Sequence, residues 1–344
     1  MEAQRNRYVL LPRDVRSDLK PSDIDPFQPH NEEWGIDYYI EVFAEIERTQ
    51  FLSGMTFYLS YVTPVDLPEY GSHVVLVIVG DETFKMKPYF SKIGAILRCY
   101  GATPAYIDGL PVRSLQRTAL LHFAYKMFGH LASVRSPLSL KAWRDDFANK
   151  KKTLHIPLGT FGNFNPKPKP IRDRSIDYAF LGSLAFDSAQ RKWQHRLFQS
   201  PKILSRRQMI EGLNTVSGNA RAKILATGDF EVSIQNKDDY VETLANTKIS
   251  LVPRGTSVET YRFYESLKAG CVIVCERLPN TWFYDGHPGI VIEDWRDLAN
   301  LLPALLADQA ALEQRAAEGL KFYRTRYSQT VVAKDISNFL APGH

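Results

Sequence analysis

The chain has few cysteines: only Cys99, Cys271 and Cys275 occur in its 344 residues. Three cysteines at these spacings make a poor disulfide framework. Cys271 and Cys275 flank a short apolar run, where cysteine usually packs as a small hydrophobic residue. A disulfide-stabilised secreted domain is therefore disfavoured, and we expect reduced thiols in a cytoplasmic setting.

Long apolar runs are also lacking. No stretch approaches the roughly 18 apolar residues that a membrane-spanning helix needs. The first twenty or so residues hold only a short apolar run followed by charges, which is unlike a secretory signal peptide. We expect no transmembrane segment, and peripheral association with a membrane stays open.

The motifs of several common chemistries are missing. The sequence contains no G-x-G-x-x-G fingerprint and no G-x-x-x-x-G-K-[ST] phosphate loop, which argues against dehydrogenases and P-loop kinases. It has no G-x-S-x-G elbow and no C-x-x-C, H-x-x-H or H-E-x-x-H spacing. The one D-x-D triplet, at residues 23–25, lies just before Pro26, where a turn is expected. We therefore expect no metal ion and no cofactor.

Charge of one sign is not concentrated anywhere. The formal net charge is +5, from 43 basic and 38 acidic residues, and the basic residues are spread over segments 150–152, 167–174 and 191–207. A nucleic-acid binder usually gathers such charge in one stretch. The balance argues against nucleic acid as a partner and is compatible with a small anionic ligand.

What the chain does contain is ample apolar material, 44% hydrophobic with 12% aromatic residues, in a length that predicts about two domains. Strand-like and helix-like patterns alternate, which favours α/β folding. Residues 1 to about 40 are polar and proline-rich, and we expect irregular structure there. Strands are expected at residues 55–62, 74–79, 104–107, 178–182, 224–227 and 289–292. Helices are expected at residues 40–51, 89–100, 115–128, 188–198, 240–246, 294–306, 310–327 and 330–340.

A stiff, exposed Pro-Lys stretch at residues 165–170 predicts the domain boundary. We expect an N-terminal Rossmann-like domain at residues 1–165 and a C-terminal one at 166–328. Residues 329–344 would form a last helix that is free to cross back to the N-terminal domain.

The most informative segment is residues 248–275, KISLVPRGTSVETYRFYESLKAGCVIVC. A β-rich run closes on Pro253, which cannot continue a central strand. Thr256 and Glu259 have the spacing of a capping box, which predicts a helix from about Ser257. Gly270 would end this helix, and a second apolar strand follows at residues 272–274. Such a strand-helix-strand unit predicts a parallel sheet.

The turn after the first of these strands holds Arg254, Gly255 and Ser257. Ligands of open α/β sheets bind at the carboxyl ends of strands. A helix N-terminus with a guanidinium and hydroxyls beside it suits a phosphate group. Gly255 would allow close approach of the backbone to a ligand, or a turn with positive φ.

The pattern PRG-x-S-x-E-T-Y-R-F-Y-E-(x4)-GC in this segment resembles the donor-side signature of the exostosin-like glycosyltransferases. The resemblance covers residues 240–283 and is faint elsewhere. It implies a GT-B fold, in which two Rossmann-like domains face each other across a cleft. It also implies an inverting hexosyl- or pentosyltransferase. Such an enzyme would move a sugar from a nucleotide diphosphate donor, by this resemblance a UDP-sugar, to a glycan acceptor such as a surface polysaccharide.

The resemblance also implies roles for single residues. Arg262 would face the donor phosphates and Glu265 would bind the ribose hydroxyls, although residues three apart could equally form an intrahelical ion pair. Glu259 would either complete the capping box or accept a sugar hydroxyl. Ser183 and Arg191 are further candidates for donor phosphate contacts, with a plain turn as the alternative.

An inverting transferase needs a base for the acceptor hydroxyl. Asp81 and Glu82, at the end of the most apolar strand, are the first candidates, and Asp108 is the second. With no metal expected, charge on the leaving group would be met by Arg254, Arg262 and a helix N-terminus.

Two other classes of function stay open at this stage. One is a transferase using another activated donor, such as a CMP-sugar or phosphoribosyl diphosphate. The other is a non-catalytic module that binds nucleotides or glycans. The sequence leaves the donor sugar, the acceptor and the oligomeric state undetermined.

Overall fold

The computed structural model describes residues 5–12, 20–30, 35–49, 52–82, 87–100, 152–162, 164–184, 201–216, 220–227, 237–255 and 257–341. These residues divide into two compact units. The first comprises the described residues up to 100, residues 152–162, and the chain from residue 326 onward. The second comprises the described residues from 164 to 325. Among all the described residues of both units, no helix combines the length and apolar character needed to cross a membrane.

The first unit is built on a mainly parallel sheet with the order β2-β1-β3-β4-β5-β6. Only the edge pair of β1 and β2 is antiparallel among the pairs described. The strands are β1 (Arg7–Leu10), β2 (Ser22–Asp23), β3 (Thr56–Ser60), β4 (Gly71–Ile78), β5 (Ile93–Arg98) and β6 (Thr153–His155). The last five residues of β4 are buried, as expected of a central strand covered on both faces.

Two helices of the first unit, α1 (Ile36–Thr49) and α10 (Gln329–Leu340), pack against each other. The rings of Tyr8 in β1, Phe43 of α1 and Phe57 of β3 all pack against one another, which places α1 on one face of the sheet. On the opposite face, a cluster including Leu76, Tyr89 and Phe90 is buried. The sheet is therefore covered on both sides.

Two expectations for this unit are wrong. Residues 1 to about 40 are not all irregular, because β1 and β2 lie there. Residues 89–100 are not one helix: a short 3₁₀ turn, η1 (Pro88–Lys92), precedes the strand β5. A strand buried on both faces has no polar alternation, so its pattern cannot be told from that of a buried helix. The elements expected at 104–107 and 115–128 lie outside the described residues.

The second unit is a parallel sheet with the order β11-β10-β9-β7-β8. Its strands are β7 (Ile176–Ser183), β8 (Ala222–Thr227), β9 (Thr247–Val252), β10 (Val272–Cys275) and β11 (Ile290–Val291). Its helices are α5 (Pro201–Asn214), α6 (Lys237–Ala245), α7 (Tyr261–Lys268), α8 (Leu298–Ala307) and α9 (Gln309–Arg326), with short 3₁₀ turns η3 (Ile171–Asp173) and η4 (Trp295–Asp297).

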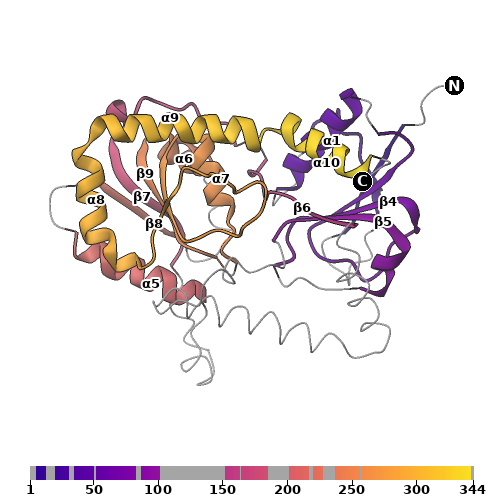
Figure 1. Ribbon diagram of the computed structural model, residues 1–344, viewed down its shortest axis with the longest axis horizontal. Helices are drawn as coiled ribbons and strands as arrows, with labels where there is room; N and C mark the ends of the chain where they lie inside the picture. Colours follow the sequence, from indigo (N-terminus) through magenta and orange to yellow (C-terminus); the bar gives the residue numbers. More distant parts are fainter. Residues whose placement is uncertain are drawn as a thin grey trace, which may run out of the picture. The chain divides into compact units, whose positions relative to one another are not determined.

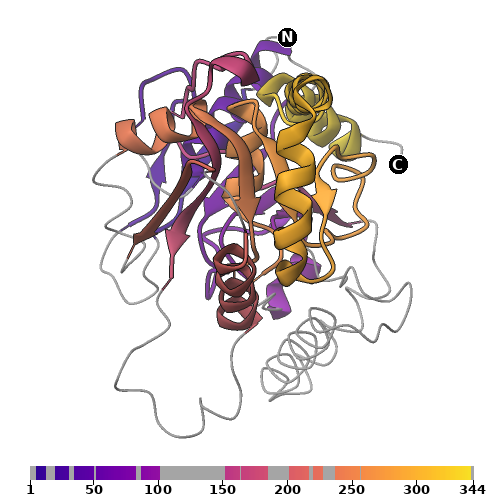
Figure 2. The same cartoon turned by 90° about the vertical axis from the view of Figure 1, so that its left-hand side faces the viewer.

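Helices flank both faces of this sheet (Figures 1 and 2). Phe180 of β7 joins one apolar cluster with residues of α5, α8 and α9. Leu181, the next residue, belongs to a separate cluster with Leu244 of α6. Alternate residues of a strand point to opposite faces, so the sheet is doubly wound. Helix α5 was not expected from the sequence, and the helix expected at 188–198 lies outside the described residues.

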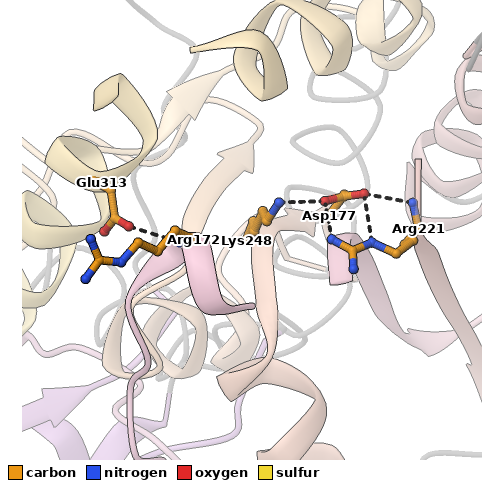
Figure 3. A network of polar contacts seen from close by, with 5 residues as sticks. All are labelled: Arg172, Asp177, Arg221, Lys248 and Glu313. Atoms are coloured by element: carbon orange, nitrogen blue, oxygen red, sulfur yellow. Dashed lines mark hydrogen bonds and ion pairs between the residues drawn. The ribbon is translucent and has the colours of Figure 1, made fainter. Parts of the chain in front are cut away.

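The amino ends of the strands in this unit carry a set of satisfied polar contacts (Figure 3). Asp177 of β7 accepts a hydrogen bond from Lys248 Nζ at 2.8 Å and from the backbone N–H of Arg221 at 2.9 Å. The backbone N–H of Arg172 bonds to Glu313 Oε1 at 3.0 Å. Partial burial would raise the pKa of Asp177, but the bonds from Lys248 and Arg221 outweigh it and lower the pKa.

Arg174 is the most fully bonded side chain at this edge. It is 2% exposed. Its Nε and Nη2 donate to the carbonyl of Lys169 at 2.9 and 2.8 Å, and Nη2 also donates to Ala269 O at 3.0 Å. Its Nη1 donates to Thr247 O at 2.7 Å and contacts Cys271 Sγ at 3.7 Å. All the N–H groups of this guanidinium thus have protein acceptors.

Candidate functional site

The strand order of the second unit reverses direction between β7 and β9. From β7, the chain places β8 on one side and then β9, β10 and β11 on the other. Open α/β sheets bind ligands outside the carboxyl ends of the strands at such a switch point, because the loops leaving the two strands diverge to opposite faces. The candidate site is therefore the edge formed by Ser183, at the end of β7, and by residues 253–255 and 257–260 after β9.

Arg262 of α7 lies at this edge. Its Nε donates to the carbonyl of Leu181 at 2.5 Å, and its guanidinium carbon lies 4.9 Å from the centre of the Phe180 ring. Its Nη1 is buried and has no hydrogen-bond partner in the part of the chain that the structure describes. Burial lowers the pKa of Arg262, and the neighbouring Tyr240 and Glu265 oppose this effect.

Gly182 makes room for this arrangement. A Cβ at residue 182 would collide with Nη2 of Arg262. The end of β7 is thus shaped so that a guanidinium can lie directly against its backbone. Arg262 is the sequence-predicted site residue that most clearly keeps donor capacity for a ligand.

Arg206 of α5 is a second guanidinium at the switch point, and sequence reasoning missed it. Its carbon lies 5.5 Å from the centre of the same Phe180 ring. Its Nη1 donates to the carbonyl of Ser183, and its Nε donates to the carbonyl of Arg254 at 3.3 Å. Arg206 therefore links the loop after β7 to the loop after β9. The only signal for it in the sequence is its place in the basic segment 191–207.

Glu265, also on α7, is 1% exposed and accepts a hydrogen bond at 2.5 Å from the hydroxyl of Tyr240 in α6. Burial and then the charge of Glu265 raise the pKa of Tyr240 well above its usual value. Arg262, Glu265 and Tyr240 form one cluster of interacting polar groups. Clusters of buried titratable groups at a sheet edge are more frequent at functional sites than elsewhere.

Arg254 follows β9 but does not present its guanidinium to solvent, since it is 1% exposed. Its Nε lies 3.7 Å from Oε2 of Glu276, and its backbone N–H donates to Oε1 of Glu276 at 3.2 Å. Oε1 also accepts hydrogen bonds from Trp295 Nε1 at 3.1 Å and from Ser205 Oγ. No motif or spacing in the sequence singles out Glu276.

The turn itself differs from the expectation. Helix α7 begins at Tyr261 with Thr260 as its N-cap, so the predicted start at Ser257 is wrong. Thr256, one residue of the expected capping box, lies outside the described residues. The backbone N–H of Glu259 donates to Ser257 Oγ at 3.4 Å. A non-helical turn after β9 supplies its own side-chain contacts, which a local spacing rule does not anticipate. Ser257 and Glu259 are both buried.

Gly255 and Arg191 are the other two residues predicted for the donor side. Gly255 does not have a positive φ, and a Cβ there would meet only ordinary contacts, the nearest at 3.6 Å. The expected turn with positive φ is therefore wrong, and close approach of the backbone to a ligand stays a prediction. Arg191 lies outside the described residues.

In the first unit, Asp81 and Glu82 follow β4. Asp81 is 5% exposed, and its Oδ2 accepts from Arg98 Nη2 at 3.0 Å and from the hydroxyl of Thr63. Glu82 is half-buried. A carboxylate held in a buried ion pair is poorly placed to meet a substrate, so Glu82 is the better of the two candidate bases. Asp108 lies outside the described residues.

Among the described residues, no group of three or more His, Cys, Asp or Glu side chains is arranged to hold a metal ion. The charged groups that the structure brings together at the carboxyl edge of the second sheet are instead arginines and glutamates. What this edge can offer a ligand from its own side chains is therefore guanidinium donors and carboxylate acceptors.

Neither a protein-family model nor a curated protein matches the sequence. Among solved structures, the chain is similar to Anabaena Alr3699/HepE in complex with UDP and glucose, with 11% identity, coverage of 99% of this chain and 100% of that one, and a TM-score of 0.50. It is also similar to WaaG, a glycosyltransferase involved in lipopolysaccharide biosynthesis, with 12% identity, coverage of 88% and 96%, and a TM-score of 0.41. The likeness to HepE shows the fold: the α/β class with two Rossmann-like units, GT-B, as predicted.

Proposed function

We propose that the chain is an inverting, metal-independent glycosyltransferase of the exostosin-like type that uses a UDP-sugar and a glycan acceptor. The observation that carries the proposal is the position and bonding of the Arg262 guanidinium. It is a guanidinium at the topological switch point, fixed by Leu181 and Phe180, with Nη1 left without a hydrogen-bond partner in the described part of the chain. A buried donor is costly unless it is bonded, so a ligand that accepts there is favoured.

The chemistry of the ligand follows from the groups nearby. Guanidinium donors recognise phosphate oxygens, and a carboxylate such as Glu265 accepts hydrogen bonds from ribose hydroxyls. A nucleoside diphosphate carries both. The complex of HepE with UDP and glucose supports uridine as the nucleoside, because that protein shares the fold over its full length.

In the proposed reaction, Glu82 takes the proton of an acceptor hydroxyl while the oxygen attacks the anomeric carbon of the sugar. The bond from that carbon to the diphosphate breaks, and UDP leaves with its charge stabilised by Arg262 and the N-terminus of α7. Asp81 holds the turn that carries Glu82, through its contacts to Arg98 and Thr63. Ser183, Gly255, Ser257 and Glu259 line the turns that approach the donor, and Arg191 is proposed as a further phosphate contact.

We also propose that the protein works in the cytoplasm, with its acceptor a growing polysaccharide that brings it to the membrane surface. All three cysteines are buried and none is bridged, which fits a reducing compartment.

Isothermal titration and thermal shift with a panel of nucleotides test the donor class. UDP should raise the melting temperature, since a ligand at 100 times its dissociation constant stabilises by about 2.7 kcal/mol. CMP and phosphoribosyl diphosphate serve as the competing donor classes, and a clear preference for either would overturn the UDP assignment. If the protein binds UDP tightly but does not hydrolyse any UDP-sugar, that result would favour a non-catalytic module.

Two further measurements test the mechanism. Glu82→Gln should lower kcat with little change in UDP affinity, because the base acts on the acceptor. Activity should survive EDTA. Loss of activity that Mn²⁺ or Mg²⁺ restores would overturn the metal-independent step.

A further inference from the structure

Glu276 is a buried carboxylate of the second unit that accepts three hydrogen bonds, and neither the sequence motif nor the proposed reaction uses it. It is 6% exposed and follows β10 directly. Its Oε1 accepts from the backbone of Arg254 at 3.2 Å, from Trp295 at 3.1 Å and from Ser205. A carboxylate buried this deeply needs such donors to offset the loss of water.

The donors come from elements that are distant in sequence. Ser205 lies on α5, Arg254 follows β9, and Trp295 begins η4 after β11. Next to Ser205, Arg206 extends the same network to the carbonyls of Arg254 and Ser183. The loops after β7, β9 and β10 are therefore joined by one set of buried polar contacts that meets at Glu276 and Arg254.

Arg254 belongs both to this network and to the turn after β9 that forms part of the proposed site. It is 1% exposed, and its Nε lies 3.7 Å from Glu276 Oε2. An arginine turned inward in this way shapes the backbone of its turn and does not reach a ligand directly. The ion pair then controls the positions of the backbone N–H groups in the turn after β9.

We infer that Glu276 is a positioning residue: through Arg254 it fixes the turn after β9 and so sets the affinity for the donor diphosphate without touching it. This assignment rests on the proposed function. Hydrogen bonds and ion pairs buried away from water are electrostatically stronger than exposed ones, so they stiffen the elements they join. A site whose groups are held in place before binding loses less free energy on binding than a mobile one.

The test compares Glu276→Gln with Asp177→Asn, by calorimetric titration of each folded variant with UDP. The glutamine can still accept from Trp295, Ser205 and the Arg254 backbone, but it removes the charge opposite the guanidinium. We expect UDP affinity to fall about tenfold, which corresponds to about 1.4 kcal/mol. Asp177→Asn removes a carboxylate with basic partners at the opposite edge of the same sheet, so it should lower the melting temperature and leave UDP affinity unchanged.

A double-mutant cycle with Arg254→Met shows whether Glu276 acts through Arg254. If it does, the double variant should bind UDP no more weakly than Arg254→Met alone. If Glu276→Gln does not fold, Ser205→Ala removes one donor to Oε1 and should weaken UDP binding by about two- to threefold, in line with the loss of one hydrogen bond.

The outcomes separate the two proposals. Unchanged UDP affinity in a folded Glu276→Gln or Ser205→Ala variant overturns the positioning role and leaves the proposed function standing. Additive losses in the cycle also overturn it. A wild-type protein that binds none of UDP, CMP or phosphoribosyl diphosphate overturns the proposed function and this assignment with it.

Discussion

Arginines occupy both edges of the second unit's sheet, but they are used differently. At the amino edge, Arg174 donates to three backbone carbonyls and contacts the sulfur of Cys271. At the carboxyl edge, Arg262 donates to Leu181 O, and its Nη1 has no hydrogen-bond partner among the described residues. Both guanidiniums lie against backbone beside a glycine, Gly270 and Gly182 respectively. The difference shows how a structural arginine is told from one that keeps capacity for a ligand: by what its donors already bind.

The largest effect is expected from Arg174→Met. The variant removes the Arg174 hydrogen bonds to the carbonyls of Lys169, Thr247 and Ala269. The bonds to Thr247 and Ala269 are buried, and each buried acceptor left unsatisfied costs about 1–3 kcal/mol. We expect a loss of about 3 kcal/mol or more, seen in urea or thermal unfolding.

The matched control is Arg172→Met, two residues earlier, whose side chain is 76% exposed. A surface change of this kind should stay within about 0.5 kcal/mol. Similar unfolding curves for the two variants would contradict the structural role of Arg174. Weaker UDP binding by folded Arg174→Met would show that an arginine at the amino edge also affects the ligand, which would contradict the difference between the two edges.

Arg262→Met should have the next largest effect, and on a different observable. Loss of a charge-assisted contact to phosphate costs roughly 1.5–3 kcal/mol, which weakens UDP binding by about 10- to 150-fold. Stability should fall by only about 1 kcal/mol, because one hydrogen bond and one contact with the Phe180 ring are lost.

Calorimetric titration of UDP and thermal unfolding of the same samples measure both effects of the Arg262 variant. Arg262→Lys keeps the charge but loses the planar fork, so its affinity should lie between those of the wild type and the methionine variant. A methionine variant that unfolds as easily as Arg174→Met while binding UDP normally would make Arg262 a structural residue as well.

How far the sequence could predict these features depends on whether their causes are local. The runs at residues 74–79 and 178–182 were predicted as strands because their apolar character is continuous over a strand's length. The segment 93–98 was misassigned for the same reason, since continuous burial also suits a helix. The fold class follows from the alternation of such segments and needs no exact boundaries.

The candidate site divides in the same way. Arg262 and Glu265 could be named because they lie in one short motif after a strand. Arg206 and Glu276 could not be named, because their contacts are with residues far away in the sequence. Arg206 bonds to Arg254, 48 positions later, and Glu276 bonds to Ser205, 71 positions earlier. No pattern in the sequence states which distant turn a helix such as α5 will meet. Burial of Arg254 was missed for a related reason: its partner Glu276 lies beyond the following strand.

The smallest effect is a pH dependence at the amino edge. Partial burial alone would raise the pKa of Asp177, but hydrogen bonds from Lys248 and Arg221 lower it below its usual value of 3.8 in the folded protein. A carboxyl group whose folded pKa is depressed adds stability that is fully present above its unfolded pKa and is lost as the pH falls through the folded one. The melting-temperature difference between wild type and Asp177→Asn should therefore be constant from pH 7 to about 5 and shrink below about pH 4. If the melting-temperature difference grows on acidification, the cost of burying Asp177 outweighs its bonds to Lys248 and Arg221. The polar groups of the amino edge would then not be fully satisfied within the protein, and the contrast with the carboxyl edge would fail.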